Sequence, residues 1–164
     1  MAAATVARLA GATLEQIRTA VMSFSGVEHR IEFVRNLGGV DYFNDSKATS
    51  VDATLKAVDA FPGGLWIILG GKDKGSDYTP LRGPLHEKAK AVLLIGAAAE
   101  KIASQLGDAV EQIECGDLAT AIRIAHERAG FGDTVLLAPA CASFDQFESF
   151  EHRGRMFKEF VRSL

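Results

Sequence analysis

The sequence predicts an α/β domain of the Rossmann-like, doubly wound type, with a mostly parallel sheet of about six strands, an N-terminal hairpin and helices on both faces. Short apolar runs alternate with segments of helical periodicity over most of the chain. Three of these runs, WIIL, AVLLI and TVLLA, are apolar on both strand faces, as strands of a parallel sheet covered by helices must be. With 164 residues, the chain is long enough for one such domain with a sizeable core.

Two short helices are expected before this domain. Residues 3–10 are rich in alanine and form the first. Thr13 and Gln16 have the spacing of a capping box, which predicts a second helix over residues 14–23. The helical pattern is then lost, so we place a boundary near residues 25–30. The two expected parts of the chain are residues 1–27 and residues 28–164.

Strands and helices then alternate. A hairpin of residues 31–34 and 40–43, turning at Gly38-Gly39, opens the domain. The strands expected after it span residues 65–69, 91–95, 109–114 and 134–138. The expected helices span residues 51–60, 98–106, 117–129 and 144–164, with further helical turns before Lys90.

Composition excludes several classes of function. The net charge is −3 and no stripe of Lys and Arg is interleaved with aromatic residues, so nucleic acid is not an expected partner. Cys115 and Cys141 lack the spacing of a zinc or redox motif, which fits a reducing compartment. No apolar run approaches ~20 residues and the N-terminus lacks the pattern of a secretory signal, so we expect a cytoplasmic protein without membrane contact.

Four polar or glycine-rich segments follow the predicted parallel strands. They are NDSKATS at residues 44–50, GGKDKGSD at 70–77, GAAA at 96–99 and PACASFD at 139–145. Because ligands of such sheets bind outside the carboxyl ends of the strands, we expect function to lie here. Lys72 and Lys74 flank Asp73, an arrangement suited to binding a phosphate or carboxylate. Ser143 is expected to cap the last helix, whose N-terminus would favour an anion.

Structural explanations remain open for these residues. Asp45 or Ser50 could cap the following helix, and Lys47 could be a solvated surface charge. The glycine- and lysine-rich segment could be a mobile surface loop. For Cys141 we favour a role as a small buried hydrophobic residue, and we assign Arg153 to a solvated helix face.

Several catalytic motifs are absent from the sequence. It contains no G-x-x-x-x-G-K-[ST] phosphate-binding loop, no G-x-G-x-x-G after a strand and no G-x-S-x-G. The four histidines lack metal-ligand spacing, so no metal-binding residue is predicted. The chain by itself therefore shows no complete site for ATP.

Taken together, these segments resemble the C-terminal domain of the Mur ligase family, over residues 28–164. The resemblance rests on HRIEFV at residues 29–34, NDSKAT at 44–49, GGKDKG at 70–75 and PACASFD at 139–145, with Phe150 and Arg153-Gly154. NDSKAT resembles the member that adds D-glutamate, because the sister ligases and the folylpolyglutamate synthetases look like DYAH at this place. Ser50 departs from the family pattern, which usually has Asn, and this affects a peripheral contact or the helix cap.

The resemblance implies a three-domain, ATP-dependent ligase that adds D-glutamate to UDP-MurNAc-L-alanine through an acyl phosphate in peptidoglycan precursor synthesis. The N-terminal domain would bind the UDP-sugar, and the central domain would hold ATP and Mg²⁺. Residues 1–27 would be the closing helices of that central domain. The present chain alone is expected to be inactive because the domain with the phosphate-binding loop is missing.

The resemblance also implies roles for particular residues. Lys47 would be catalytic, with Asp45 directed toward the ribose hydroxyls and Arg30 and Lys47 toward phosphate. The expected nucleotide-binding residues are Arg30, Asn44, Asp45 and Lys47. The expected D-glutamate-binding residues are Thr49, Lys74, Ser143, Phe144 and Phe150. The expected partners are D-glutamate, UDP-MurNAc-L-alanine, ATP and the missing domains of the same chain.

A second hypothesis belongs to another class of function. The chain could be a free-standing binding or regulatory module that has kept the fold and lost catalysis. An upstream reading frame encoding G-x-x-x-x-G-K-[ST] would favour the ligase.

Overall fold

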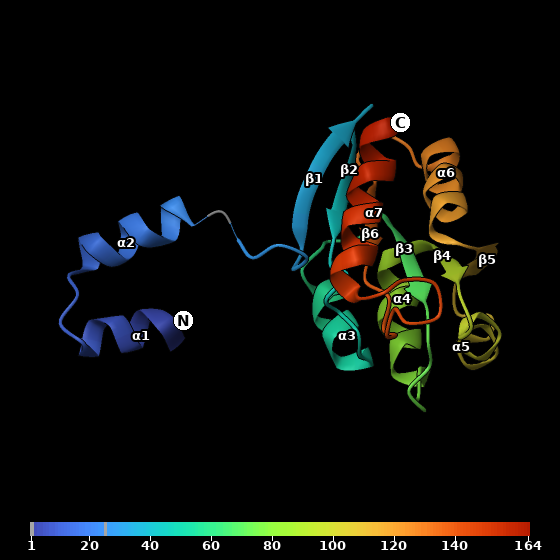
Figure 1. Cartoon of the computed structure of the whole chain (residues 1–164), viewed down its shortest axis with the longest axis horizontal. Coiled ribbons are helices and arrows are strands. Elements are labelled where there is room, and N and C mark those ends of the chain that lie inside the picture. The colour runs from blue at the N-terminus through green and yellow to red at the C-terminus, as the bar shows by residue number, and fades with distance from the viewer. Residues whose placement is uncertain (1, 25) are drawn as a thin grey trace.

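The computed structural model describes residues 2–24 and 26–164 and contains one six-stranded sheet (Figure 1). The strands are β1 (Glu32–Leu37), β2 (Val40–Asn44), β3 (Leu65–Gly70), β4 (Ala89–Ile95), β5 (Glu111–Gly116) and β6 (Thr134–Leu137). Their order in the sheet is β1-β2-β6-β3-β4-β5. β1 and β2 form the predicted antiparallel hairpin, and all other neighbours are parallel. The mostly parallel α/β fold is confirmed.

Helices cover both faces of the sheet. They are α3 (Val51–Asp59), a 3-10 turn (Thr79–Leu81), α4 (Arg82–Lys88), α5 (Ala99–Leu106), α6 (Leu118–Arg128) and α7 (Phe150–Ser163). The sequence of β3 is apolar throughout because both faces of this strand are buried. Leu65, Ile67 and Leu69 pack in the core under α3, α4 and α5. Trp66 and Ile68 pack in the core under α6 and α7.

Two helices precede the sheet, α1 (Ala2–Leu9) and α2 (Leu14–Ser23). The predicted capping box is present, because Thr13 accepts from the Gln16 N–H while the Gln16 side chain accepts from the Thr13 N–H. Neither helix has a buried residue. Their large apolar side chains are open to solvent, and the pair lies apart from the α/β body in Figure 1. These apolar side chains include Val6, Leu14 and Val21, and Phe24 at the C-cap of α2 is exposed as well.

The last helix begins later than the sequence predicted. Helix α7 starts at Phe150, not at Phe144, and its N-cap is Ser149, whose hydroxyl accepts from the His152 N–H. The prediction that Ser143 caps this helix is therefore wrong. Side chains of the intervening segment instead bond to the segments after β4 and at the end of β5. Asp145 accepts from the Ala97 N–H, and the Gln146 amide donates to the Gly116 carbonyl.

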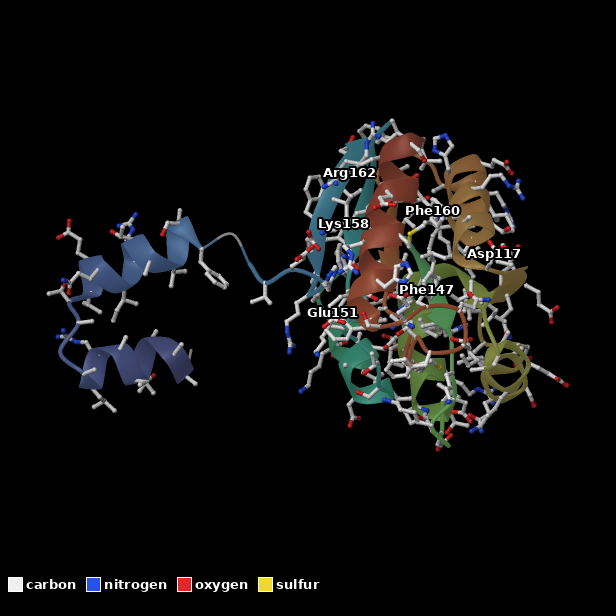
Figure 2. The ribbon with its side chains drawn as sticks, in the orientation of Figure 1. Asp117, Phe147, Glu151, Lys158, Phe160 and Arg162 are labelled. Carbon is white, nitrogen blue, oxygen red and sulfur yellow. The ribbon has the colours of Figure 1, made fainter. Side chains whose placement is uncertain are left out.

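Three phenylalanines of this last region pack as expected of core residues, whereas Phe144 and the half-buried Phe150 do not. Phe157 is buried, and Phe147 and Phe160 pack against the core that α6 and α7 cover (Figure 2). Phe144, in contrast, is 66% exposed. Among residues 2–24 and 26–164, no helix has the length and apolar character needed to cross a membrane.

The position of the cap predicts different costs for two serine substitutions. Ser149→Ala should lower the free energy of unfolding by about 1 kcal/mol, because an N–H in the first turn of α7 loses its acceptor. Denaturant unfolding measures this cost. Ser143→Ala is the matched control and should cost less, since its hydroxyl caps no helix; a larger loss for Ser143→Ala would contradict the placement of the cap.

Candidate functional site

The segments that follow β2, β3, β4 and β6 meet at one edge of the sheet. We call this edge the rim and define it as residues 44–50, 70–77, 96–98 and 138–149. Main-chain hydrogen bonds join neighbouring segments, from Ala140 N to Ala48 O and from Lys72 N to Ala142 O, both at 2.9 Å. Another runs from Ala98 N to the Gly71 carbonyl at 2.9 Å. The convergence predicted for the strand ends is therefore present.

Arg153 of α7 holds the rim together from beneath. Its side chain is fully buried, which corrects its assignment to a solvated helix face. The guanidinium donates to the Ser46 hydroxyl and carbonyl, both at 2.9 Å, and to the carbonyls of Cys141 at 3.2 Å and Ala142 at 3.4 Å. Burial lowers the pKa of Arg153 to about 10, so the group stays cationic at neutral pH.

Gly71 allows two of these segments to approach closely. It has a φ of 132°, and a Cβ at this position would collide with the Ala142 carbonyl oxygen. Only glycine fits this contact without displacing a main chain. Gly71, the second residue of the Gly70-Gly71 pair, therefore allows two segments of the rim to pack together.

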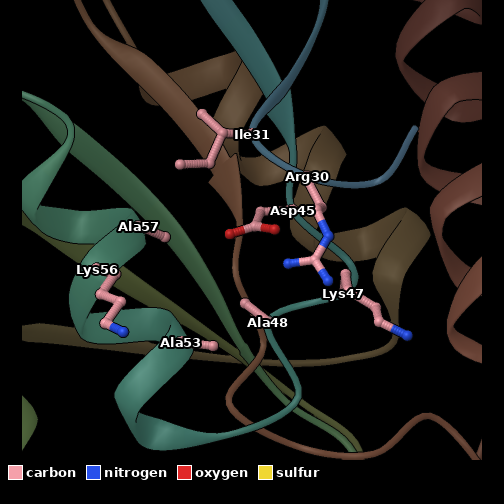
Figure 3. Close-up of a pocket in the computed structure, with 8 residues that line it drawn as sticks. All are labelled: Arg30, Ile31, Asp45, Lys47, Ala48, Ala53, Lys56 and Ala57. Atoms are coloured by element: carbon pink, nitrogen blue, oxygen red, sulfur yellow. The ribbon is translucent and has the colours of Figure 1, made fainter. Parts of the chain in front are cut away.

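A cavity of about 300 Å³ lies at the rim beside α3 (Figure 3). Its lining residues are Arg30, Ile31, Asp45, Lys47, Ala48, Ala53, Lys56 and Ala57. Asp45 is only 7% exposed. Burial raises the pKa of Asp45, while a hydrogen bond from the Ile31 N–H and the charge of Arg30 act in the opposite direction. The cavity thus combines one buried carboxylate with three cationic side chains.

Three of the four predicted nucleotide-binding residues line this cavity: Arg30, Asp45 and Lys47. Asn44, the fourth, is fully buried. Its amide lies 2.9 Å from Nδ1 of His29 and donates to Glu32 at 3.0 Å, while its carbonyl accepts from the Ser46 N–H. These internal bonds make Asn44 a residue that shapes the turn around Asp45.

Lys47 connects this cavity to residues predicted for D-glutamate. Its ammonium lies 3.8 Å from the centre of the Phe150 ring, a cation–π contact. Phe150 also makes an edge contact with His29, with ring centres 6.0 Å apart. The first residue of α7 therefore contributes to fixing the cation that NDSKATS supplies.

The other residues predicted for D-glutamate belong to the same rim but differ in exposure. Lys74 and Phe144 are exposed, Thr49 is half-buried and Ser143 is buried. Asp73, which lies between Lys72 and Lys74 in the sequence, has partners on other elements. Its carboxylate binds Lys101 at 2.8 Å and the Tyr78 hydroxyl at 2.8 Å.

Two residues of the site were not predicted. Lys56 on α3 lines the cavity, and Lys101 on α5 is the ion-pair partner of Asp73. Ser50 caps α3 by accepting from the Ala53 N–H, so the capping alternative is confirmed for Ser50. Cys141 is fully buried, as expected, with its Sγ 3.0 Å from the Tyr78 hydroxyl.

Comparison with known proteins gives concordant similarities. Residues 29–141 match the family described as "Mur ligase, glutamate ligase domain". The whole chain is 65% identical to UDP-N-acetylmuramoylalanine--D-glutamate ligase of Solibacter usitatus and 56% identical to that of Koribacter versatilis. It spans only 37% and 36% of the lengths of these two relatives.

Two solved structures share the fold. A bifunctional folylpolyglutamate synthase/dihydrofolate synthase from Yersinia pestis superposes with a TM-score of 0.63 at 20% identity, over 91% of this chain and 34% of that one. A murein peptide ligase from Psychrobacter arcticus gives 0.57 at 14% identity, over 99% and 36% of the two chains. At these identities the likeness concerns the fold alone.

The contacts of Asp73 predict a pH-dependent contribution to stability. The hydrogen bonds from Lys101 and Tyr78 lower the pKa of Asp73 from 3.8 to about 2. Because the folded-state pKa is the lower one, this stabilisation is complete above pH 3.8 and is lost as the pH falls toward 2. Asp73→Asn should therefore reduce the free energy of unfolding by about 1 to 2 kcal/mol at neutral pH.

Denaturant unfolding at neutral pH and near pH 2.5 measures this effect, and the difference between the variant and the parent should shrink at the lower pH. Asp108→Asn is a control, because the Asp108 side chain is fully exposed. It should change stability by less than about 0.5 kcal/mol. A cost for Asp73→Asn that is independent of pH would contradict the assignment.

Proposed function

Because this chain belongs to the Mur ligase family and matches its glutamate ligase domain, we propose that it is the C-terminal domain of an ATP-dependent ligase that joins D-glutamate to UDP-MurNAc-L-alanine. Such a ligase acts in peptidoglycan precursor synthesis. The observation that carries the proposal is the rim, where a cationic cavity around Asp45 is adjacent to the segments bearing Lys74 and Ser143.

We assign residues 1–27 to the end of the preceding central domain. The exposed apolar side chains of α1 and α2 support this assignment, because the two helices bury no residue among the described part of the chain. The coverage of little more than a third of the relatives also supports further domains. The phosphate-binding loop and any Mg²⁺ ligands would belong to those domains, so this chain alone would be inactive.

The cavity fits the ribose and phosphate parts of a nucleotide. The buried Asp45 carboxylate can accept hydrogen bonds from ribose hydroxyls. Arg30 can bind phosphate oxygens through its planar fork of donors, and Lys47 can act as a compact positive charge. Lys56, on the α3 side of the cavity in Figure 3, adds a further cation.

The remaining rim residues would bind D-glutamate. Lys74 is exposed and can pair with a carboxylate, while the hydroxyls of Thr49 and Ser143 can donate hydrogen bonds. Phe150, under Lys47, would provide an apolar wall, and Phe144 would add to it. Anion binding by a helix N-terminus at Ser143 is excluded, because no helix begins there.

ATP would supply the phosphoryl group that activates the substrate carboxylate, and the amine of D-glutamate would then displace phosphate from the acyl phosphate. Lys47 would stabilise the negative charge on the phosphoryl group during transfer. Arg30 and Asp45 would orient the nucleotide, and closure of this domain would exclude water from the labile acyl phosphate. The turnover of the full-length ligase would therefore depend on the position of the rim.

A free-standing binding module remains the alternative function. The residues of the rim can persist in a protein without catalysis, since the fold does not determine function. The two proposals differ in whether the encoding frame continues upstream into a phosphate-binding loop. The short coverage of the relatives favours the ligase.

The ligase proposal predicts a strong effect of Lys47→Ala in the full-length enzyme. Loss of the ammonium should lower kcat by about 100- to 1,000-fold, because charge on the transferring group loses its partner. The measurement of kcat is phosphate release in the presence of ATP, Mg²⁺, UDP-MurNAc-L-alanine and D-glutamate. Controls omit each of these components in turn. Arg123→Ala, which removes an exposed ion pair on α6, should leave kcat unchanged. Equal rates for Lys47→Ala and the parent would refute the role of Lys47.

The D-glutamate site can be tested on the 164-residue chain itself. Titration with D-glutamate should shift the amide resonances of Lys74 and Ser143 more than titration with L-glutamate does. Weak binding is expected, because other walls of the site would lie on the missing domains. Amide NMR spectra of the labelled chain provide the measurement, and equal shifts with both enantiomers would count against this pocket.

A further inference from the structure

A group of charged side chains fixes the segment that leads into β1. Lys158 on α7 contacts Glu28 Oε1 at 2.5 Å and Glu32 Oε1 at 3.0 Å. The other oxygen of Glu32 accepts from the His29 N–H at 3.0 Å and from the Asn44 amide at 3.0 Å. We call Glu28, His29, Glu32, Asn44 and Lys158 the linker clamp.

Charge compensation in the linker clamp comes from the lysine. Atoms of Glu28, His29 and Glu32 lie within 4.8 Å of one another, a spacing that could hold a cation. The Lys158 ammonium already contacts both carboxylates, and its side chain is only 11% exposed. Burial by itself would lower the pKa of Lys158, but the hydrogen bonds to the two carboxylates raise it above its usual value. The two glutamate carboxylates are therefore ion-paired with Lys158.

The linker clamp surrounds an unusual stretch of main chain. His29 has a φ of 64° and Ile31 a φ of 43°, in the left-handed region that a β-branched residue adopts only under constraint. Arg30 lies between them and lines the cavity beside Asp45. The direction of the Arg30 side chain thus depends on two residues in a strained conformation.

Contacts on both sides of Arg30 keep this conformation. The His29 carbonyl accepts from the Lys47 N–H at 3.1 Å. The buried imidazole ring of His29 lies against α7, where a Cβ on Gly154 would collide with the ring. Burial lowers the pKa of His29, which favours the neutral ring, and in the tautomer with a bare Nδ1 this atom accepts from the Asn44 amide. Lys158 anchors the same segment through Glu28 and Glu32, from the side of α7 that faces β1 in Figure 2.

We propose that Lys158 is a positioning residue for nucleotide binding: by bridging Glu28 and Glu32 it holds residues 28–32 in the conformation that directs Arg30 into the cavity. This inference rests on the proposed function, because it requires Arg30 to contact the nucleotide. Without the bridge, the strained segment relaxes in part of the molecules. The apparent affinity for ATP then falls in proportion to the fraction that remains competent.

The test uses Lys158→Met in the full-length enzyme, since methionine keeps an unbranched apolar side chain and removes the ammonium. The KM for ATP should rise about 5- to 20-fold with kcat changed less than 2-fold, because the competent fraction affects binding before chemistry. Glu28→Gln, at a largely exposed side chain that leaves the fold intact, should raise the KM by a smaller factor. Lys90→Met is the control, because it breaks a lysine–carboxylate pair with Asp133 at the start of β4, away from the rim.

A double variant separates a positioning role from a general loss of stability. In an Arg30→Ala background, Lys158→Met should cause no further rise in the KM for ATP, because the group on which it acts is gone. Equal increases in both backgrounds would overturn the proposal. An unchanged KM in Arg30→Ala alone would instead refute the nucleotide role of Arg30 and with it the proposed site.

A second measurement needs no nucleotide. In the 164-residue chain, Lys158→Met should speed hydrogen exchange of the His29 and Lys47 amides at least 10-fold, while amides of β3 keep their rates. Lys90→Met should leave the His29 and Lys47 amides unaffected. Unchanged exchange of these two amides in Lys158→Met would show that the linker clamp does not hold the segment.

Discussion

The buried guanidinium of Arg153 is the interaction on which the arrangement of the rim depends. It joins the segment after β2, through Ser46, to the segment after β6, through Cys141 and Ala142. The atoms that it contacts are a hydroxyl and three carbonyl oxygens, so the charge is satisfied by main-chain dipoles. Displacing either segment would take two of the four acceptors from the buried charge, at a cost of about 1.5 to 3 kcal/mol for each hydrogen bond lost. This penalty keeps the two segments together.

The chemistry proposed for the rim follows from this constraint. Arg153 binds the main chain of Ser46, the residue before Lys47, and Phe150 at the start of the same helix packs under the Lys47 ammonium. Helix α7 therefore sets both the position of the turn and the direction of its cation. The same helix carries Lys158, about two helical turns beyond Phe150, where it holds the segment of Arg30. Helix α7 therefore positions both Lys47 and Arg30 relative to the buried carboxylate of Asp45.

The sequence predicted those features that depend on local patterns. The apolar runs of β3, β4 and β6 and the capping box at Thr13 require only neighbouring residues to be recognised. The predictions that were wrong depend on long-range contacts. Nothing near Arg153 indicates that carbonyls more than ten residues away will bury it, and the late start of α7 follows from Asp145 bonding to Ala97. The left-handed conformation of Ile31 is likewise set by contacts with distant elements. Of the cavity, NDSKATS and Arg30 were recognised from their motifs, whereas Lys56 has a spacing typical of any exposed helix face.

The order of the strands has a consequence for synthesis of the protein on the ribosome. β6 is the last strand in the chain but lies between β2 and β3, and it supplies hydrogen-bonding partners to both. Until residues 134–137 have been synthesised, β2 and β3 each lack the neighbour that β6 provides, so their edges on that side stay unpaired. Such edges attract other chains. Completion of the sheet, and protection from aggregation, must therefore await the synthesis of β6.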